Sequence, residues 1–224
     1  VKQQPNYMKL YKAYLIILFI LIIDQGSKIW VKTHMMLYQS EPITSWFNIY
    51  FVENEGMAFG MVLPGIMGKL FLSIFRLVAV FGGAWYLRKL VNENQHWGFI
   101  TSVAMILAGA IGNMIDGTFY GIIFTDSHYR VAEMFSAAGG YGQALTGKVV
   151  DMLYFPIING VFPRWFPVWG GEPFTFFNAI FNVADSAITI GVFIILIFQS
   201  RFFVPNELET GIPAGLAETE TQNP

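Results

Sequence analysis

The stretch FNAIFNVADSAITIGVFIILIFQSRFF, residues 177–203, decides the fold of this chain. It exceeds the roughly 20 residues that a helix needs to cross the hydrocarbon core of a bilayer. One acidic residue, Asp185, stands inside it. A carboxylate at that depth costs about 2.5 to 3.5 kcal/mol on insertion scales, so it is a functional candidate by default. The stretch therefore predicts a membrane-spanning helix that carries a functional carboxylate.

Three further apolar stretches have the same character, at residues 11–31, 66–87 and 97–116. Over the whole chain 54% of the residues are hydrophobic and only 12% are charged, which is too apolar for an ordinary soluble domain. We predict an all-α membrane protein with four transmembrane helices and a small outward-facing β element and cap. Four aspartates are functional candidates: Asp24, Asp116 and Asp185 lie inside or against these stretches, and Asp151 lies in the segment between the third and the fourth.

The distribution of Lys and Arg predicts the orientation in the membrane. Basic residues precede the first span, occupy the short turn after the second and follow the fourth. By the positive-inside rule both termini and that turn are cytoplasmic. Residues 1–204 then form one domain with outward segments at 37–65 and 117–176. The tail at 205–224 has four glutamates and no aromatic residue, and we expect it to be disordered.

The two outward segments differ in pattern. Residues 47–52 alternate in polarity, which predicts a small hairpin or sheet in the first segment. The second segment is rich in Gly, Pro and aromatic residues, which indicates a compact cap on the membrane surface.

Polar residues recur at helical spacing in two of the spans. In the last span the intervals are 4, 3 and 4, at Asn178, Asn182, Asp185 and Thr189. In the third span Gly109, Asn113 and Asp116 share a face. The asparagines at 113 and 182 fit either hydrogen bonding between helices or a functional site.

Four charged residues, Asp24, Lys28, Asp151 and Arg76, have explanations that require no functional role. Asp24 and Lys28 are four residues apart, which fits an intrahelical ion pair at a helix end. Asp151 follows Lys148 closely and could be a surface residue that this lysine satisfies. Arg76 lies within the second span and must reach the interface or a carboxylate.

Composition excludes several kinds of chemistry. The chain has no cysteine, and its net charge of −2 gives no case for nucleic acid. The histidines lie at or beyond the span ends without an H-E-x-x-H pair, so neither a metal site nor a Ser/His pair is indicated. Two adjacent aspartates that share a proton can hydrolyse an amide without a cofactor. A proton-coupled transporter or channel subunit, which also uses intramembrane carboxylates, is the alternative.

Five short motifs resemble, in order, those of the bacterial lipoprotein signal peptidases, the signal peptidase II family. The motifs are Asp24-Gln25-x-x-Lys28, Asn54-x-Gly56-x-Ala58-Phe59, Gly112-Asn113-x-x-Asp116, Val149-Val150-Asp151 and Phe181-Asn182-x-Ala184-Asp185-Ser186. The resemblance implies an inner-membrane aspartic endopeptidase that cuts before a diacylglyceryl-modified cysteine, and the predicted topology places its site near the outer face. The resemblance also implies prolipoprotein substrates and contact with membrane lipid, and we further expect no cofactor and a monomer.

The resemblance assigns roles to these residues. Asp151 and Asp185 match the catalytic aspartates. The cleft-lining positions are matched by Asn54, Gly56, Asn113 and Asn182, and the supporting positions by Asp24, Lys28 and Asp116.

Two features depart from the family pattern. Gly117 stands where the family usually has arginine, and the segments at 118–147 and 154–176 are longer than in compact members. We expect Arg76 to approach Asp116 and to replace the charge that is missing at position 117.

Overall fold

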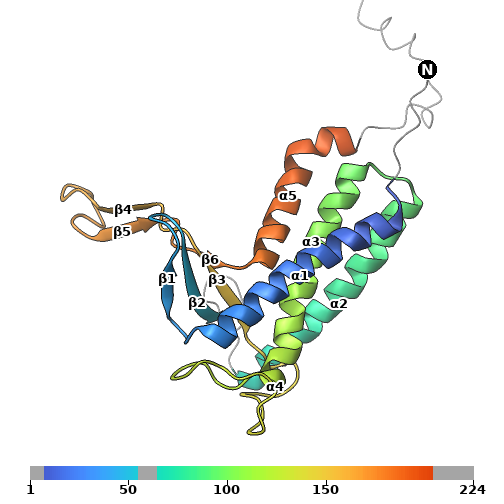
Figure 1. Ribbon diagram of the computed structural model, residues 1–224. Helices are drawn as coiled ribbons and strands as arrows, with labels where there is room; N and C mark the ends of the chain where they lie inside the picture. The colour runs from blue at the N-terminus through green and yellow to red at the C-terminus, as the bar shows by residue number, and fades with distance from the viewer. Residues whose placement is uncertain (1–7, 55–64, 204–224) are drawn as a thin grey trace, which may run out of the picture.

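A computed structural model describes residues 8–54 and 65–203 of the chain (Figure 1). Four of its helices are long and apolar enough to cross a membrane, which confirms the predicted fold class: α1 (Leu10–His34), α2 (Gly65–Asn92), α3 (Trp97–Ile115) and α5 (Val183–Phe202). Beyond α3 the chain continues through a π-helical turn, η2 (Asp116–Tyr120), and the short α4 (Gly121–Ile123). Glycine at position 56 and the tail at 205–224 lie outside the described residues.

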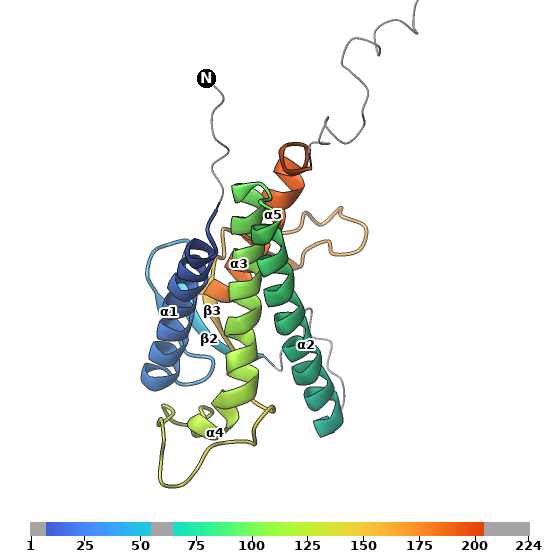
Figure 2. The same ribbon diagram turned by 90° about the vertical axis from the view of Figure 1, so that its right-hand side faces the viewer.

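The helix α3 is the centre of the bundle and contacts α1, α2 and α5 (Figure 2). Its buried face includes Ile100, Ala104, Leu107 and Ala108, which pack with Ala13 and Leu87 in one apolar cluster. Large apolar side chains on the other helices point away from the bundle, including Phe19, Phe71, Phe81 and Ile197. This outer apolar surface is the one that lipid covers in a membrane protein.

A four-stranded antiparallel sheet lies at the end of the bundle where α1 ends and α5 begins (Figure 1). Its strands run in the order β1 (Ser40–Pro42), β2 (Asn48–Asn54), β3 (Val149–Tyr154) and β6 (Ile180–Phe181). The predicted β element in the first outward segment is therefore correct. The sheet also takes two strands from beyond residue 148, and Val52 on β2 faces Asp151 on β3.

The helix α5 begins later than the sequence pattern indicates. Its N-cap is Asn182, whose side chain accepts a hydrogen bond from the backbone N–H of Asp185, while the Asp185 carboxylate accepts one from the backbone of Asn182. This reciprocal capping box ends the extended chain of β6 and starts the helix. The prediction that Asn178 belongs to the helical stripe is wrong, because Asn178 precedes β6 and accepts a hydrogen bond from the Tyr154 hydroxyl at 3.0 Å.

The second outward segment is not one compact cap. Its first part folds back under the end of α1, where Phe124 is buried and the Ser127 carbonyl accepts a hydrogen bond from the backbone of Leu37. Its second part forms a hairpin of β4 (Ile158–Val161) and β5 (Pro173–Phe176). This hairpin projects sideways from the bundle, across the direction of the helices, in both ribbon views (Figures 1 and 2).

Candidate active site

Asp151 and Asp185 meet through one asparagine. Asp151 lies in the middle of β3, and Asp185 lies in the first turn of α5. The side-chain amide of Asn182 donates to Asp151 Oδ1 at 2.7 Å, and its backbone N–H approaches Asp185 Oδ2 at 3.4 Å. A single capping residue therefore holds both carboxylates.

Two further asparagines bind the other oxygens of the pair. The amide of Asn113, on α3, donates to Asp185 Oδ1 at 2.8 Å. The amide of Asn54, at the end of β2, donates to Asp151 Oδ2 at 3.3 Å. The asparagines that match cleft-lining positions thus bind the carboxylates directly, and they fix the orientation of both groups.

The environment of Asp151 favours its protonated form. The residue is only 4% exposed. Burial, and then the neighbouring carboxylate of Asp185, raise the pKa of Asp151 to about 7, against the opposing effect of the Asn54 and Asn182 amides. Below about pH 7 Asp151 therefore keeps a proton that it can donate.

Behind the pair, Lys28 is the centre of a fully buried ion cluster. Its ammonium lies 2.9 Å from Asp24 and 2.8 Å from Asp116, and all three side chains have no exposed surface. The same ammonium donates to Asn113 Oδ1 at 3.0 Å, which leaves the Asn113 amide to face Asp185. The pair of Asp24 and Lys28 is therefore one edge of a cluster that joins α1 to α3.

The two aspartates of this cluster also hold the backbone just before each candidate catalytic residue. Asp24 Oδ1 accepts from the N–H of Ala184 at 2.9 Å. Asp116 Oδ2 accepts from the N–H of Val150 at 3.3 Å. The residues that precede Asp185 and Asp151 are thus tied to one buried cluster, so the spacing of the two carboxylates depends on it.

One residue of the cluster received no role from the sequence. Gln25 donates to Asp116 Oδ1 at 2.9 Å and to Asp24 Oδ2 at 3.0 Å, and it accepts from the Tyr120 hydroxyl at 3.1 Å. The signal in the sequence that could have identified Gln25 is its place in the motif Asp24-Gln25-x-x-Lys28.

A second buried ion network lies under the sheet. Lys32 binds Glu53 and the Ser127 hydroxyl, and Lys148 binds the other oxygen of Glu53 at 3.3 Å. Burial alone raises the pKa of Glu53, but Lys32 and then Lys148 hold it below its ordinary value. The simpler reading of Asp151 as a surface residue satisfied by Lys148 is therefore wrong, because Asp151 is buried and Lys148 pairs with Glu53.

Close packing of α3 on α5 depends on glycine. A Cβ at Gly109 would overlap the carbonyl oxygen of Ala184, and one at Gly112 would lie 2.5 Å from Asp24 Oδ2. Small residues are what allow helix backbones to approach this closely in membranes. The ion cluster and the first turn of α5 can meet only because these side chains are absent.

Arg76 reaches the site from α2. One turn before it, the Ser73 hydroxyl donates to the Leu145 carbonyl at 2.7 Å, which ties α2 to the segment after η2. Arg76 Nη1 lies 3.5 Å from the point where a Cβ of Gly117 would stand. The guanidinium interacts electrostatically with Asp116, Asp185 and Asp151. The expected approach of Arg76 to Asp116 is therefore seen, and it extends to both candidate catalytic residues.

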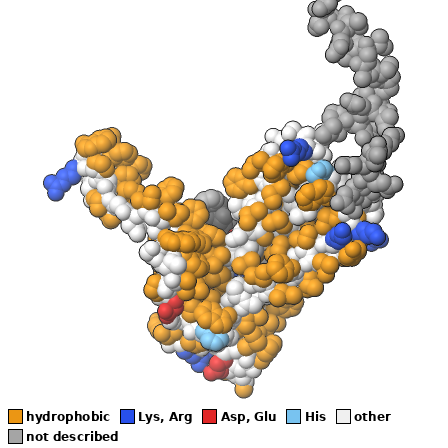
Figure 3. All heavy atoms as spheres, turned by 45° about the horizontal axis from the view of Figure 1, so that its top comes forward, with side chains coloured by type: hydrophobic (Ala, Val, Ile, Leu, Met, Phe, Trp, Pro, Cys, Tyr) orange, Lys and Arg blue, Asp and Glu red, His pale blue; other side chains and the backbone are white. Residues whose placement is uncertain are grey.

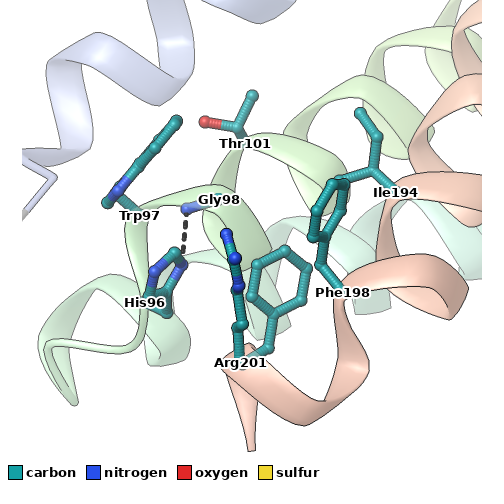
Figure 4. Close-up of a pocket in the computed structure, with 8 residues that line it drawn as sticks. His96, Trp97, Gly98, Thr101, Ile194, Phe198 and Arg201 are labelled. Carbon is teal, nitrogen blue, oxygen red and sulfur yellow. Dashed lines mark hydrogen bonds between the residues drawn. The ribbon is translucent and has the colours of Figure 1, made fainter.

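A cavity of about 470 Å³ lies at the other end of the bundle, roughly one helix length or 27 Å away (Figure 4). The Arg201 side chain points into it between rings from α3 and α5, and His96 Nδ1 accepts a hydrogen bond from the backbone of Gly98 (Figure 4). None of the side chains that line it is acidic. Within residues 8–54 and 65–203 no cluster of three or more His, Cys, Asp or Glu could hold a metal ion.

Four membrane-spanning helices, together with two aspartates that asparagines hold near each other, are the fold and the chemical groups of a membrane-embedded aspartic hydrolase. The family model described as signal peptidase (SPase) II matches residues 16–201. The chain therefore belongs to the signal peptidase II family.

Similarity to individual proteins agrees with this family. The lipoprotein signal peptidase of Porphyromonas gingivalis is 50% identical over 187 residues, which cover 83% of this chain and 81% of that protein. The lipoprotein signal peptidase of Amoebophilus asiaticus is 34% identical over 197 residues, covering 84% and 78%. A solved structure described as a bacterial membrane enzyme is 27% identical, covers 88% of this chain and 97% of its own, and has a TM-score of 0.56.

Proposed function

We propose that this protein is an aspartic endopeptidase of the membrane that removes signal peptides from diacylglyceryl-modified prolipoproteins, cutting before the lipidated cysteine. The observation that carries the proposal is the bridge from Asn182 to both Asp151 and Asp185 inside a member of the signal peptidase II family. The substrate class follows from relatives that are named lipoprotein signal peptidases. Membership of this family gives no support to the transporter or channel alternative.

In this mechanism the two carboxylates share one proton. Asp185 accepts a proton from a water molecule, whose oxygen attacks the scissile carbonyl carbon. Asp151, protonated below about pH 7, donates its proton to the carbonyl oxygen. The carbon–nitrogen bond then breaks: the proton taken by Asp185 goes to the leaving amine, and one hydroxyl of the tetrahedral intermediate returns a proton to Asp151. The products are a carboxylic acid and a free amino group, so no metal or cofactor is needed.

We place the active site near the outer face of the bacterial inner membrane, with both termini cytoplasmic. The support is the set of Lys and Arg residues that flank the opposite ends of the spans in short segments, including Lys9, Lys12, Arg88, Lys89 and Arg201. The carboxylate pair lies where α3 ends and α5 begins, away from those residues. We further propose that the protein acts as a monomer.

A cleavage assay on a diacylglyceryl-modified preprotein tests this function. Asp151→Asn and Asp185→Asn should each abolish turnover while the purified protein stays folded, and the double variant should be no less active than either single one. Asp126→Asn is the matched control, because that carboxylate is 52% exposed and binds only His128 among the contacts described. Wild-type activity should persist in strong chelator. Substantial turnover by either single variant, or metal-dependent recovery, would refute the assignment.

A further inference from the structure

The hairpin of β4 and β5 exposes an unusual density of apolar side chains. We define the aromatic arm as residues 157–177; it contains only two charged residues, Arg164 and Glu172. Exposed fractions reach 79% at Trp165 and 71% at Val168. Figure 3 shows the arm covered with hydrophobic side chains and a cationic side chain at its end. A patch of this kind on a protein marks an interaction surface.

The arm has an internal structure of its own. The ring of Phe162 packs on Phe174 at 4.6 Å, on Phe166 at 5.1 Å and on Trp169 at 6.0 Å between centroids. The hairpin pairs Ile158 with Phe176 at its base. The exposed tryptophan and valine are therefore carried on a packed unit and do not belong to an extended loop.

A short stretch of chain connects the arm to the start of the α5 span. The strand β5 ends at Phe176, and α5 enters its apolar span at Val183, so at most about 25 Å of chain separates them. The strand β6 shortens this link further, since it pairs with β3 in the main sheet. The arm then runs sideways from this point, across the helices (Figures 1 and 2). It is thus attached near the N-terminal end of the α5 span.

We propose that the aromatic arm is an interfacial anchor that lies in the headgroup region of the leaflet at the N-terminal end of α5. Tryptophan is enriched at that level of membranes, and an apolar surface with few charges is buried there by about 5 to 10 Å. Arg164 is suited to a lipid phosphate. Both ends of the arm lead into the sheet strands beside Asp151 and Asp185, so a lipid-bound arm sets the depth of the carboxylate pair relative to the bilayer.

The absence of native cysteine makes the test direct. Trp165→Cys and Val168→Cys are labelled with an environment-sensitive fluorophore in nanodiscs that hold one protein copy and lipids with a nitroxide close to the headgroup. Ala138→Cys, exposed on the segment that folds under α1, is the matched control. We expect the two arm positions to be quenched at least about threefold more strongly than the control, with blue-shifted emission.

The readout does not depend on catalysis, so its result is independent of whether the proposed function is correct. Equal quenching at the arm and control positions, together with full quenching of the arm by aqueous iodide, would overturn the proposal. Protection of the arm from iodide without quenching by the nitroxide lipids would also overturn it, because protein would then be the covering surface. Protection that appears only when two copies share a nanodisc would assign the arm to a second copy instead.

Discussion

Substitutions at Arg76 and Gly117 test the electrostatics of the site most directly. Arg76→Gln removes a half-buried cation that interacts with Asp116, Asp185 and Asp151. Since a nearby cation favours ionised carboxylates, its loss moves the alkaline limb of the pH–rate profile, which Asp151 sets, to higher pH. Below that limb the lost electrostatic stabilisation of the carboxylate pair should lower kcat/KM. Arg76 is partly exposed and screened, so we expect about a tenfold loss in kcat/KM, which corresponds to about 1.4 kcal/mol.

The single change Gly117→Arg should also impair the enzyme. Its Cβ would stand 3.5 Å from Arg76 Nη1, so the new side chain would start beside the Arg76 guanidinium. Two cations about 4 Å apart repel by about 4 kcal/mol at an effective dielectric constant of 20, of which side-chain movement relieves a part. Gly117→Ala is the steric control, because its Cβ makes only ordinary contacts. We expect at least about a tenfold loss for the arginine, since 1.4 kcal/mol corresponds to that factor, and little change for the alanine.

In the double variant, the effect of Gly117→Arg on activity changes from a loss to a gain. With Arg76→Gln in place, Gly117→Arg supplies a cation from the neighbouring position and should restore part of the activity and of the original pH–rate profile. The coupling energy, from kcat/KM on a diacylglyceryl-modified preprotein in detergent micelles, should be about 1 to 3 kcal/mol. Arg76→Lys, which keeps the charge, should leave the pH–rate profile unchanged. Strict additivity of the two changes, or a wild-type pH profile in Arg76→Gln, would refute the reasoning.

Three further outcomes follow from the site. Because Asp151 must keep its proton, kcat/KM should fall as pH rises through about 7, the pKa to which burial and Asp185 raise this group; a pH–rate profile checks this. Asp24→Asn and Asp116→Asn each break a fully buried ion pair, so we expect a loss of about 3 kcal/mol and a lower Tm, whereas Glu93→Gln at an exposed pair should leave Tm unchanged. Gly109→Ala places a Cβ against a backbone carbonyl and should cost about 3 kcal/mol or more by thermal unfolding, while a methyl group added to the open-sided glycine at position 82 should be neutral.

The sequence by itself determined the four spans, because apolar length is a local property and only a helix satisfies its backbone within one segment of a bilayer. It also identified Asp24, Asp116 and Asp185, since a carboxylate beside such a segment is costly wherever the chain folds, whereas Asp151 was singled out by its motif Val149-Val150-Asp151. The Asp24 and Lys28 pair was likewise readable, because four residues on a helix bring two side chains together.

Tertiary structure alone decided how these residues meet. Asp151 is buried because β3 pairs with β2, about a hundred residues earlier in the chain, and that register has no local signal. The start of α5 at Val183 depends on a capping box and a short strand that the apolar pattern conceals. The position of Arg76 beside Gly117 depends on how α2 packs. The direction of the aromatic arm depends on where the chain leaves the sheet after β3 and re-enters it at β6. Each of these rests on contacts between distant segments, which no spacing along the chain records.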